Sequence, residues 1–80
     1  MRIPRDMSAE DLISLLRRFE YKSTRQTGSH IRLTTAMNGE HHITIPRHTP
    51  LKVGTLSSIL KEIASYLETD SQHIIEELFS

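Results

Sequence analysis

The spacing of apolar residues changes along this chain of 80 residues, first from a helical period to a strand period and later back again. Near the start, apolar residues recur at intervals of three and four, at Leu12, Leu15, Leu16 and Phe19. This spacing places all four side chains on one face of a helix that must cover a core. Ser8, with Asp11 three residues on, can cap the free amides, so we expect the helix to begin near Ala9.

Between residues 21 and 46 the apolar period becomes two. Ile31, Leu33, Ile43 and Ile45 all occupy odd positions, with polar residues between them. This alternation is typical of an antiparallel sheet that has one wet face. We expect three strands near residues 21–26, 30–36 and 40–46, joined by turns at residues 27–29 and around Asn38-Gly39.

The second turn decides which residues of the last two strands face each other. A two-residue turn of Asn38 and Gly39 would set each apolar position against a polar one. A three-residue loop from Met37 to Gly39, with Gly39 in the left-handed conformation, sets Leu33 opposite Ile43. We prefer this loop, although a loop of residues 38–40 also satisfies the parity.

The helical period returns after the sheet. Thr55 is a plausible cap for a second helix, and Asp70 for a short third one. The expected order is therefore α-β-β-β-α-α, an α+β fold in which a three-stranded antiparallel sheet has its helices packed on one face. The other face stays open. We interpret residues 1–80 as a single domain with its core in residues 8–79.

Composition narrows the functional classes. The chain has no cysteine, which excludes disulfides and thiolate metal sites, and no apolar run that could span a bilayer, so we expect a cytoplasmic protein that has no membrane partner. The net charge is zero, but residues 17–61 hold eight basic residues against two acidic ones, whereas residues 62–80 hold five acidic residues and no basic one. Two ordinary solvated faces would also give this asymmetry, which is compatible with a nucleic-acid partner.

The histidines are the candidates for chemistry. His30 opens the second expected strand at an even position, so alternation places it on the open face with Arg32. An imidazole there can exchange protons near neutral pH, and a neighbouring arginine favours a phosphate. A solvated strand histidine is the alternative interpretation.

The other histidines are weaker candidates. The preferred register sets Pro46 opposite His30, so His48 should lie within a few residues of His30. His41 and His42 must point to opposite faces, so a shared metal ion is hard to build and we expect no metal site and no cofactor.

Three short motifs carry a resemblance to a known family. They are Thr27-Gly28-Ser29-His30, Ile45-Pro46-Arg47-His48 and the segment from Gly54 to Lys61 with the sequence GTLSSILK. In this order and approximate spacing, they make residues 8–79 resemble the HicA family of bacterial toxins. One departure is Glu20-Tyr21, where many members have Gly-Phe, and this puts the local turn in doubt.

The resemblance implies a fold like the double-stranded RNA-binding domain, cleavage of mRNA independently of the ribosome, and neutralisation by a HicB antitoxin. The family's catalytic histidine corresponds to His30, and Ser29 and His48 become possible auxiliary residues.

On this basis we expect His30 to act, without a metal, as the general base that deprotonates a ribose 2′-hydroxyl. The residues expected to bind phosphates are Lys22, Arg25, Arg32, Arg47 and Lys52. Strand one's facing cannot be read, but strict alternation implies that Lys22 and Arg25 cannot share a face. The alternatives are a binding module that holds RNA without cleaving it, and an inactivated toxin that only docks on another protein.

Overall fold

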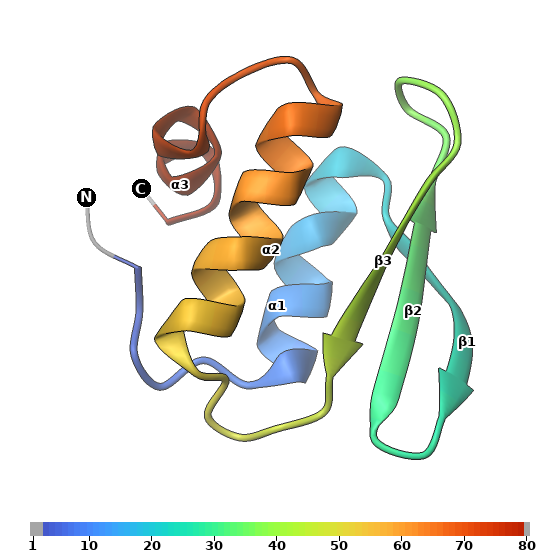
Figure 1. Ribbon diagram of the computed structural model, residues 1–80, viewed down its shortest axis with the longest axis vertical. Helices are drawn as coiled ribbons and strands as arrows, with labels where there is room; N and C mark the ends of the chain where they lie inside the picture. Colours follow the sequence, from blue (N-terminus) through green and yellow to red (C-terminus); the bar gives the residue numbers. More distant parts are fainter. Residues whose placement is uncertain (1–2, 80) are drawn as a thin grey trace.

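A computed structural model describes residues 3–79 of the chain. In chain order the elements are α1 (Ala9–Leu16), the 3-10 helix η1 (Arg17–Phe19), β1 (Lys22–Thr27), β2 (His30–Thr35), β3 (His41–Pro46), α2 (Val53–Tyr66) and α3 (Ser71–Phe79). The strands form one antiparallel sheet in the order β1-β2-β3 (Figure 1). The expected α+β fold and its element order are therefore confirmed, and the arrangement is consistent with a fold like the double-stranded RNA-binding domain.

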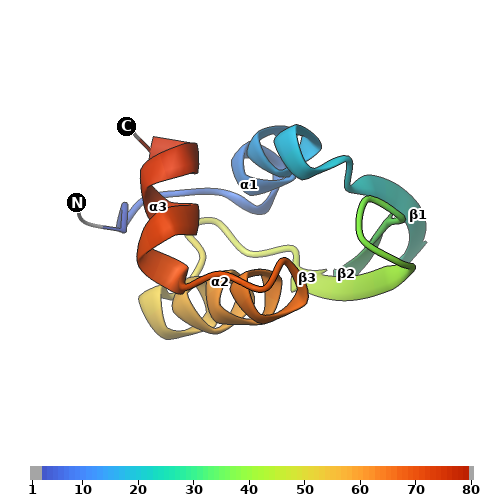
Figure 2. The same cartoon turned by 90° about the horizontal axis from the view of Figure 1, so that it is seen from above.

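The sheet lies against one layer of helices and leaves its other face open. Seen from above, α1 and α2 lie on the same side of the sheet, and α3 packs against the helices (Figure 2). The core is formed by apolar side chains from this helix side of the sheet and from all three α-helices; its strand members are Ile31, Leu33, Ile43 and Ile45. Within residues 3–79, no helix has the length and apolar character needed to cross a bilayer.

The register between β2 and β3 is the one expected from parity. Leu33 lies opposite Ile43 and His30 opposite Pro46, while Gly39 in the connecting loop has a φ of 90°. Glycine adopts this left-handed conformation at little cost. The observed register confirms the prediction. Its physical reason is that a shift of one residue would move every apolar side chain of the strand to the wet face.

A bulge in β1 changes which of its residues face the open side. Lys22 lies opposite Thr34 and Arg25 opposite Arg32, and the register shifts between Ser23 and Arg25. Directly opposed residues of an antiparallel pair project to the same face. Lys22 and Arg25 therefore share the open face, and the expectation that they cannot is wrong because one extra residue interrupts the alternation.

The helix starts agree with the sequence in two cases out of three. At α1, Ser8 accepts a hydrogen bond from the backbone N–H of Asp11 at 3.0 Å, as predicted, and at α3 Asp70 accepts one from the N–H of His73 at 2.8 Å. The prediction for Thr55 is wrong. Helix α2 begins at Val53 after an extended Lys52 without a side-chain cap, so Thr55 lies inside the first turn.

The departure at Glu20 does not prevent a left-handed turn there. Glu20 has a φ of 63°, a left-handed conformation that costs a residue with a side chain roughly 1 kcal/mol. Its N–H donates to the carbonyl of Arg17 at 2.9 Å, and the next N–H, of Tyr21, donates to the carbonyl of Leu16 at 3.3 Å. The turn thereby delivers Tyr21 into the core, where its side chain is fully buried.

Candidate active site on the open face of the sheet

His30 is the first residue of β2 and follows a tight turn. Gly28 in this turn has a φ of 55°, which glycine tolerates best. His30 pairs with Thr27 on β1 and with Pro46 on β3, so it stands on the central strand between two neighbours. Its side chain is exposed on the open face.

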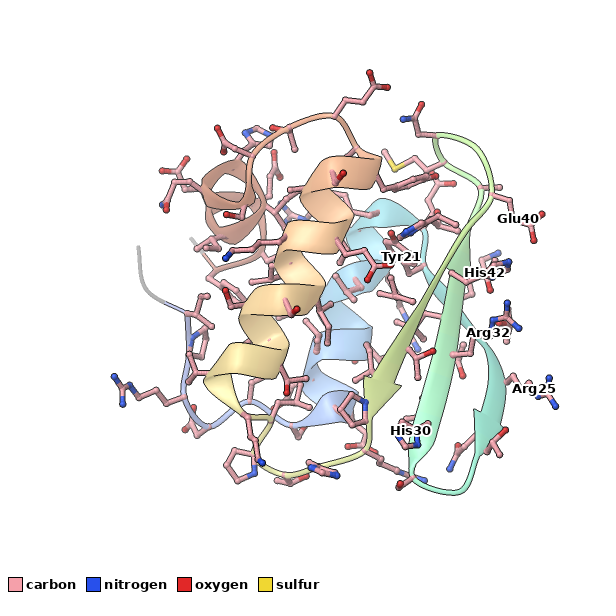
Figure 3. The ribbon with its side chains drawn as sticks, viewed as in Figure 1. Tyr21, Arg25, His30, Arg32, Glu40 and His42 are labelled. Carbon is pink, nitrogen blue, oxygen red and sulfur yellow. The ribbon has the colours of Figure 1, made fainter. Side chains whose placement is uncertain are left out.

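An open depression of about 320 Å³ surrounds His30 on this face. Its lining comes from all three strands and consists of Arg25, Thr27, His30, Arg32, His42 and Thr44. In Figure 3, His30, Arg25, Arg32 and His42 follow one another along the side of the sheet that faces away from the helices. The depression therefore gathers two arginine and two histidine side chains from the three strands.

The two arginines of the depression lie directly opposite each other. Arg25 on β1 pairs with Arg32 on β2, and neither guanidinium has an ion-pair partner among residues 3–79. Like charges in directly opposed positions of a sheet are destabilising. A bound anion would remove this repulsion, and planar guanidinium groups match the oxygens of a phosphate.

The imidazole of His30 carries no orienting partner of its own. In the part of the chain that the structure describes, it makes no hydrogen bond and no ion pair. Its backbone neighbours are fixed, because the N–H of Arg47 donates to the carbonyl of Ser29 at 2.6 Å. The turn is thus held in place while the ring stays free to meet a ligand.

Arg47, which the sequence analysis placed among the phosphate-binding residues, is occupied elsewhere. Its Nε donates to Oε2 of Glu10 on α1 at 2.8 Å. This hydrogen bond from Arg47 holds the pKa of the Glu10 carboxyl below its ordinary value. The pair links the segment after β3 to the first helix, next to the turn that carries Ser29 and His30.

The other residues expected from the sequence, Lys22, Lys52 and His48, lie away from the depression around His30. Lys22 lies on the open face, opposite Thr34 and further along the sheet than the depression. Lys52 precedes α2 and His48 follows β3; both are exposed, and neither lines the depression around His30. The structure therefore brings Arg25 and Arg32 to His30, and leaves His48 and Lys52 outside.

His42 is a residue of this face that the sequence analysis did not select. Its Nε2 lies 3.0 Å from Oε2 of Glu40, and its Nδ1 lies 2.8 Å from the hydroxyl of Thr34. The same hydroxyl is 2.8 Å from that of Thr24, so a chain of polar contacts crosses all three strands. The sequence could have identified His42 through the preferred register of β2 and β3, because that pairing sets His42 opposite Thr34 on the open face.

His41 points to the helix side, as the alternation predicted. Its Nδ1 is 2.8 Å from the hydroxyl of Tyr21, its Nε2 is 3.3 Å from Oε2 of Glu62, and its ring stacks on Tyr66 at 4.4 Å between centroids. Burial raises the pKa of the Tyr21 phenol far above its ordinary value, and Tyr66 and Glu62 add to the shift. Within residues 3–79, no group of three or more His, Asp or Glu side chains could hold a metal ion.

Comparison of the chain with known proteins finds one family whose sequence model it matches. A model of the family described as "HicA toxin of bacterial toxin-antitoxin" matches residues 9–64. The match runs from the start of α1 through the sheet into α2, so it contains the depression around His30, while α3 lies beyond it. No curated protein matches the chain, and no solved structure does.

Proposed function

The chain belongs to the HicA family of toxins from bacterial toxin–antitoxin systems, and we propose that it is an endoribonuclease that cleaves mRNA independently of the ribosome. RNA is the substrate, a HicB-type antitoxin is the partner that neutralises the activity, and the cytoplasm is where both are met. The observation that carries the proposal is the cationic depression around His30, in which Arg25 and Arg32 oppose each other without an acidic partner among residues 3–79.

In the proposed reaction, His30 is the catalytic residue. Its neutral imidazole takes the proton of a ribose 2′-hydroxyl, and the 2′-oxygen attacks the adjacent phosphorus. The bond from phosphorus to the 5′-oxygen of the next nucleotide breaks, that oxygen takes a proton from water, and the His30 imidazolium returns its proton to the solvent. The products are a 2′,3′-cyclic phosphate and a 5′-hydroxyl, and DNA is inert because it lacks the nucleophile.

The arginines neutralise the phosphate in this scheme. Arg25 and Arg32 contact its non-bridging oxygens, whose negative charge grows as the 2′-oxygen attacks. Lys22 contacts a phosphate further along the sheet. Lys52 would contact the RNA outside the depression, and Arg47 would do so only after leaving Glu10. Ser29 and His48 do not line the depression, so they would act only as auxiliary residues.

The test is cleavage of a mixed-sequence single-stranded RNA in EDTA by the purified protein. His30→Ala should lower the cleavage rate by about 100-fold or more, because general base catalysis typically contributes 10² to 10⁴-fold. His73→Ala is the matched control, since His73 lies on α3 and is 57% exposed, and it should cleave like the parent. Equal cleavage by both variants would contradict the assignment, and 5′-phosphate ends formed only with magnesium would contradict the mechanism.

One observation favours a second candidate, an RNA-binding module that does not turn its ligand over. Catalytic histidines are usually oriented by a hydrogen bond to their second ring nitrogen, and within residues 3–79 the imidazole of His30 has none. The same assay separates the candidates. RNA that stays intact while it binds with a clear salt dependence would support the binding module.

A further inference from the structure

A second hollow lies at the opposite end of β2 from His30, where the open face of the sheet meets the turn after η1. Its volume is about 700 Å³, and its lining includes Arg17, Glu20, Lys22, Thr24, Ala36 and Glu40. Figure 3 shows Glu40 at one end of the row of labelled side chains and His30 at the other. The hollow falls within the usual size range of small-molecule pockets, about 300 to 1,000 Å³, and a single nucleotide is small enough to enter it.

The polar atoms in the wall of the hollow are already satisfied. The hydroxyl of Thr35 donates to the carbonyl of Phe19 at 2.8 Å, and the hydroxyl of Tyr21 is held by His41 at 2.8 Å. What remains for a ligand on the inside is largely apolar, including the methyl group of Ala36. Such a surface suits the flat face of an aromatic ring better than a hydrated ion.

The charged groups at the rim are free, by contrast. Among residues 3–79, Arg17, Glu20 and Lys22 have no side-chain hydrogen bond and no ion-pair partner, while Glu40 is engaged by His42 at 3.0 Å. The rim thus offers two cations and one carboxylate. Cations bind phosphate oxygens, and a carboxylate accepts hydrogen bonds from amino groups of bases.

We propose that this hollow binds one unpaired nucleobase that carries an exocyclic amino group. Glu20 accepts a hydrogen bond from the amino group, and Arg17 and Lys22 contact the adjoining phosphate. Sequence-specific recognition of RNA relies on unstacked bases whose edges are read in this way. The proposal rests on RNA being the substrate, and it makes the hollow a specificity site for the reaction at His30.

The two hollows follow each other along the sheet and share no lining residue. The chain of contacts from Thr24 through Thr34 and His42 to Glu40 separates them, with three members lining the hollow and His42 lining the depression around His30. His30 and Thr34 are four residues apart on β2, about 13 Å in an extended strand. An RNA strand along β2 would therefore be cleaved a few nucleotides away from the recognised base.

The test measures binding of labelled oligouridylates that contain a single guanosine, adenosine or cytidine, or none. The protein carries His30→Ala so that the RNA stays intact. Uracil serves as the background because it is the one RNA base of the four that has no exocyclic amino group. The amino-bearing bases should bind about 5-fold more tightly or better, the range for one well-made base contact. Glu20→Gln should lower this preference and Ala36→Trp, which fills the hollow, should abolish it.

Gln72→Trp is the matched control, since Gln72 is exposed on α3 and does not line the hollow, and it should keep the preference. Equal binding of all four RNAs, or a preference that survives both variants, would overturn the proposal. So would a loss of antitoxin binding in Ala36→Trp with RNA binding unchanged, because the hollow would then be a protein site. Cleavage by the parent chain is assayed in parallel: a preference without cleavage refutes the nuclease and keeps the base site, whereas cleavage without a preference does the reverse.

Discussion

His41 and His42 are neighbours in the sequence, and they show how differently the two faces of the sheet are built. His41 lies on the helix side, between Tyr21, Tyr66 and the carboxylate of Glu62. His42 lies on the open side, in contact with Glu40 and Thr34. One face holds its polar groups inside a packed cluster that stabilises the fold. The other leaves cations and a histidine exposed, where a ligand can reach them.

The largest expected difference between the two faces is in the loss of stability caused by Leu33→Ala and by Arg32→Ala, two substitutions at neighbouring positions of β2. Leu33 is fully buried, so Leu33→Ala should lower the free energy of unfolding by about 2 to 5 kcal/mol. A domain of this size has roughly 4 to 12 kcal/mol in total. Arg32→Ala should change it by less than about 0.5 kcal/mol, because Arg32 is an exposed surface residue.

Urea unfolding followed by circular dichroism measures both changes. The same Arg32→Ala protein should bind RNA more weakly and with a salt slope reduced by about one, as expected for a lost phosphate contact. The comparison would fail if Arg32→Ala destabilised the protein as much as Leu33→Ala does.

The two histidines give the next largest contrast. His41→Ala leaves the hydroxyl of the buried Tyr21 without its hydrogen-bond partner, which should cost about 1 to 3 kcal/mol of unfolding free energy. The rate of RNA cleavage by the folded protein should stay unchanged. His42→Ala should cost less than about 1 kcal/mol, because its contacts are exposed, yet it should weaken RNA binding. A slower cleavage rate in folded His41→Ala would show that the two faces are coupled.

Much of the fold could be predicted because one face of the sheet is apolar. The odd positions of Leu33 and Ile43 determined the pairing of β2 with β3, and Ser8 and Asp70 were recognisable caps. The facing of β1 could not be predicted, since each of its residues is polar and exposed. Without apolar alternation, nothing in the sequence marks the bulge that brings Lys22 and Arg25 to the same side.

The site was predictable in part for the same reason. His30 and Arg32 share the open face by alternation alone, and the register also placed His42 there, although motif matching drew attention to His48. The pairing of Arg47 with Glu10 could not be foreseen, because it joins residues 37 positions apart and depends on how α1 docks on the sheet. Contacts of this kind are set by tertiary packing and leave no local pattern.

Alkaline pH should weaken the helix-side cluster of His41, Tyr21, Tyr66 and Glu62. The unfolded chain ionises Tyr21 at the ordinary pKa of 10.0, whereas burial raises the pKa of this phenol in the folded state. Stability is therefore fully present below pH 10 and falls as the pH rises above it, by at most about 1.4 kcal/mol per pH unit. Urea midpoints between pH 8 and 11 measure the fall, and Tyr21→Phe should flatten it. Tyr66→Phe, which keeps Tyr21, should retain the fall; an equally flat profile there would contradict the assignment.

The smallest effect concerns Glu10, which holds Arg47 beside the turn of His30. Arg47 donates to the Glu10 carboxylate and lowers its pKa below the ordinary value of 4.5. The stabilisation from this pair is therefore present above pH 4.5 and lost as the pH falls through the lowered pKa. Both side chains are about half exposed, so Glu10→Gln should leave the thermal midpoint near that of the parent.

What Glu10→Gln should change is the RNA affinity, because it releases Arg47 for a phosphate. The slope of log affinity against log salt should steepen by at most about one, and adding Arg47→Ala should return it to the parent value. If Glu10→Gln bound RNA no better but cleaved it more slowly, the pair would serve to position the Ser29-His30 turn. Arg47 would then have a structural role, like the residues on the helix side of the sheet, although its guanidinium lies at the surface.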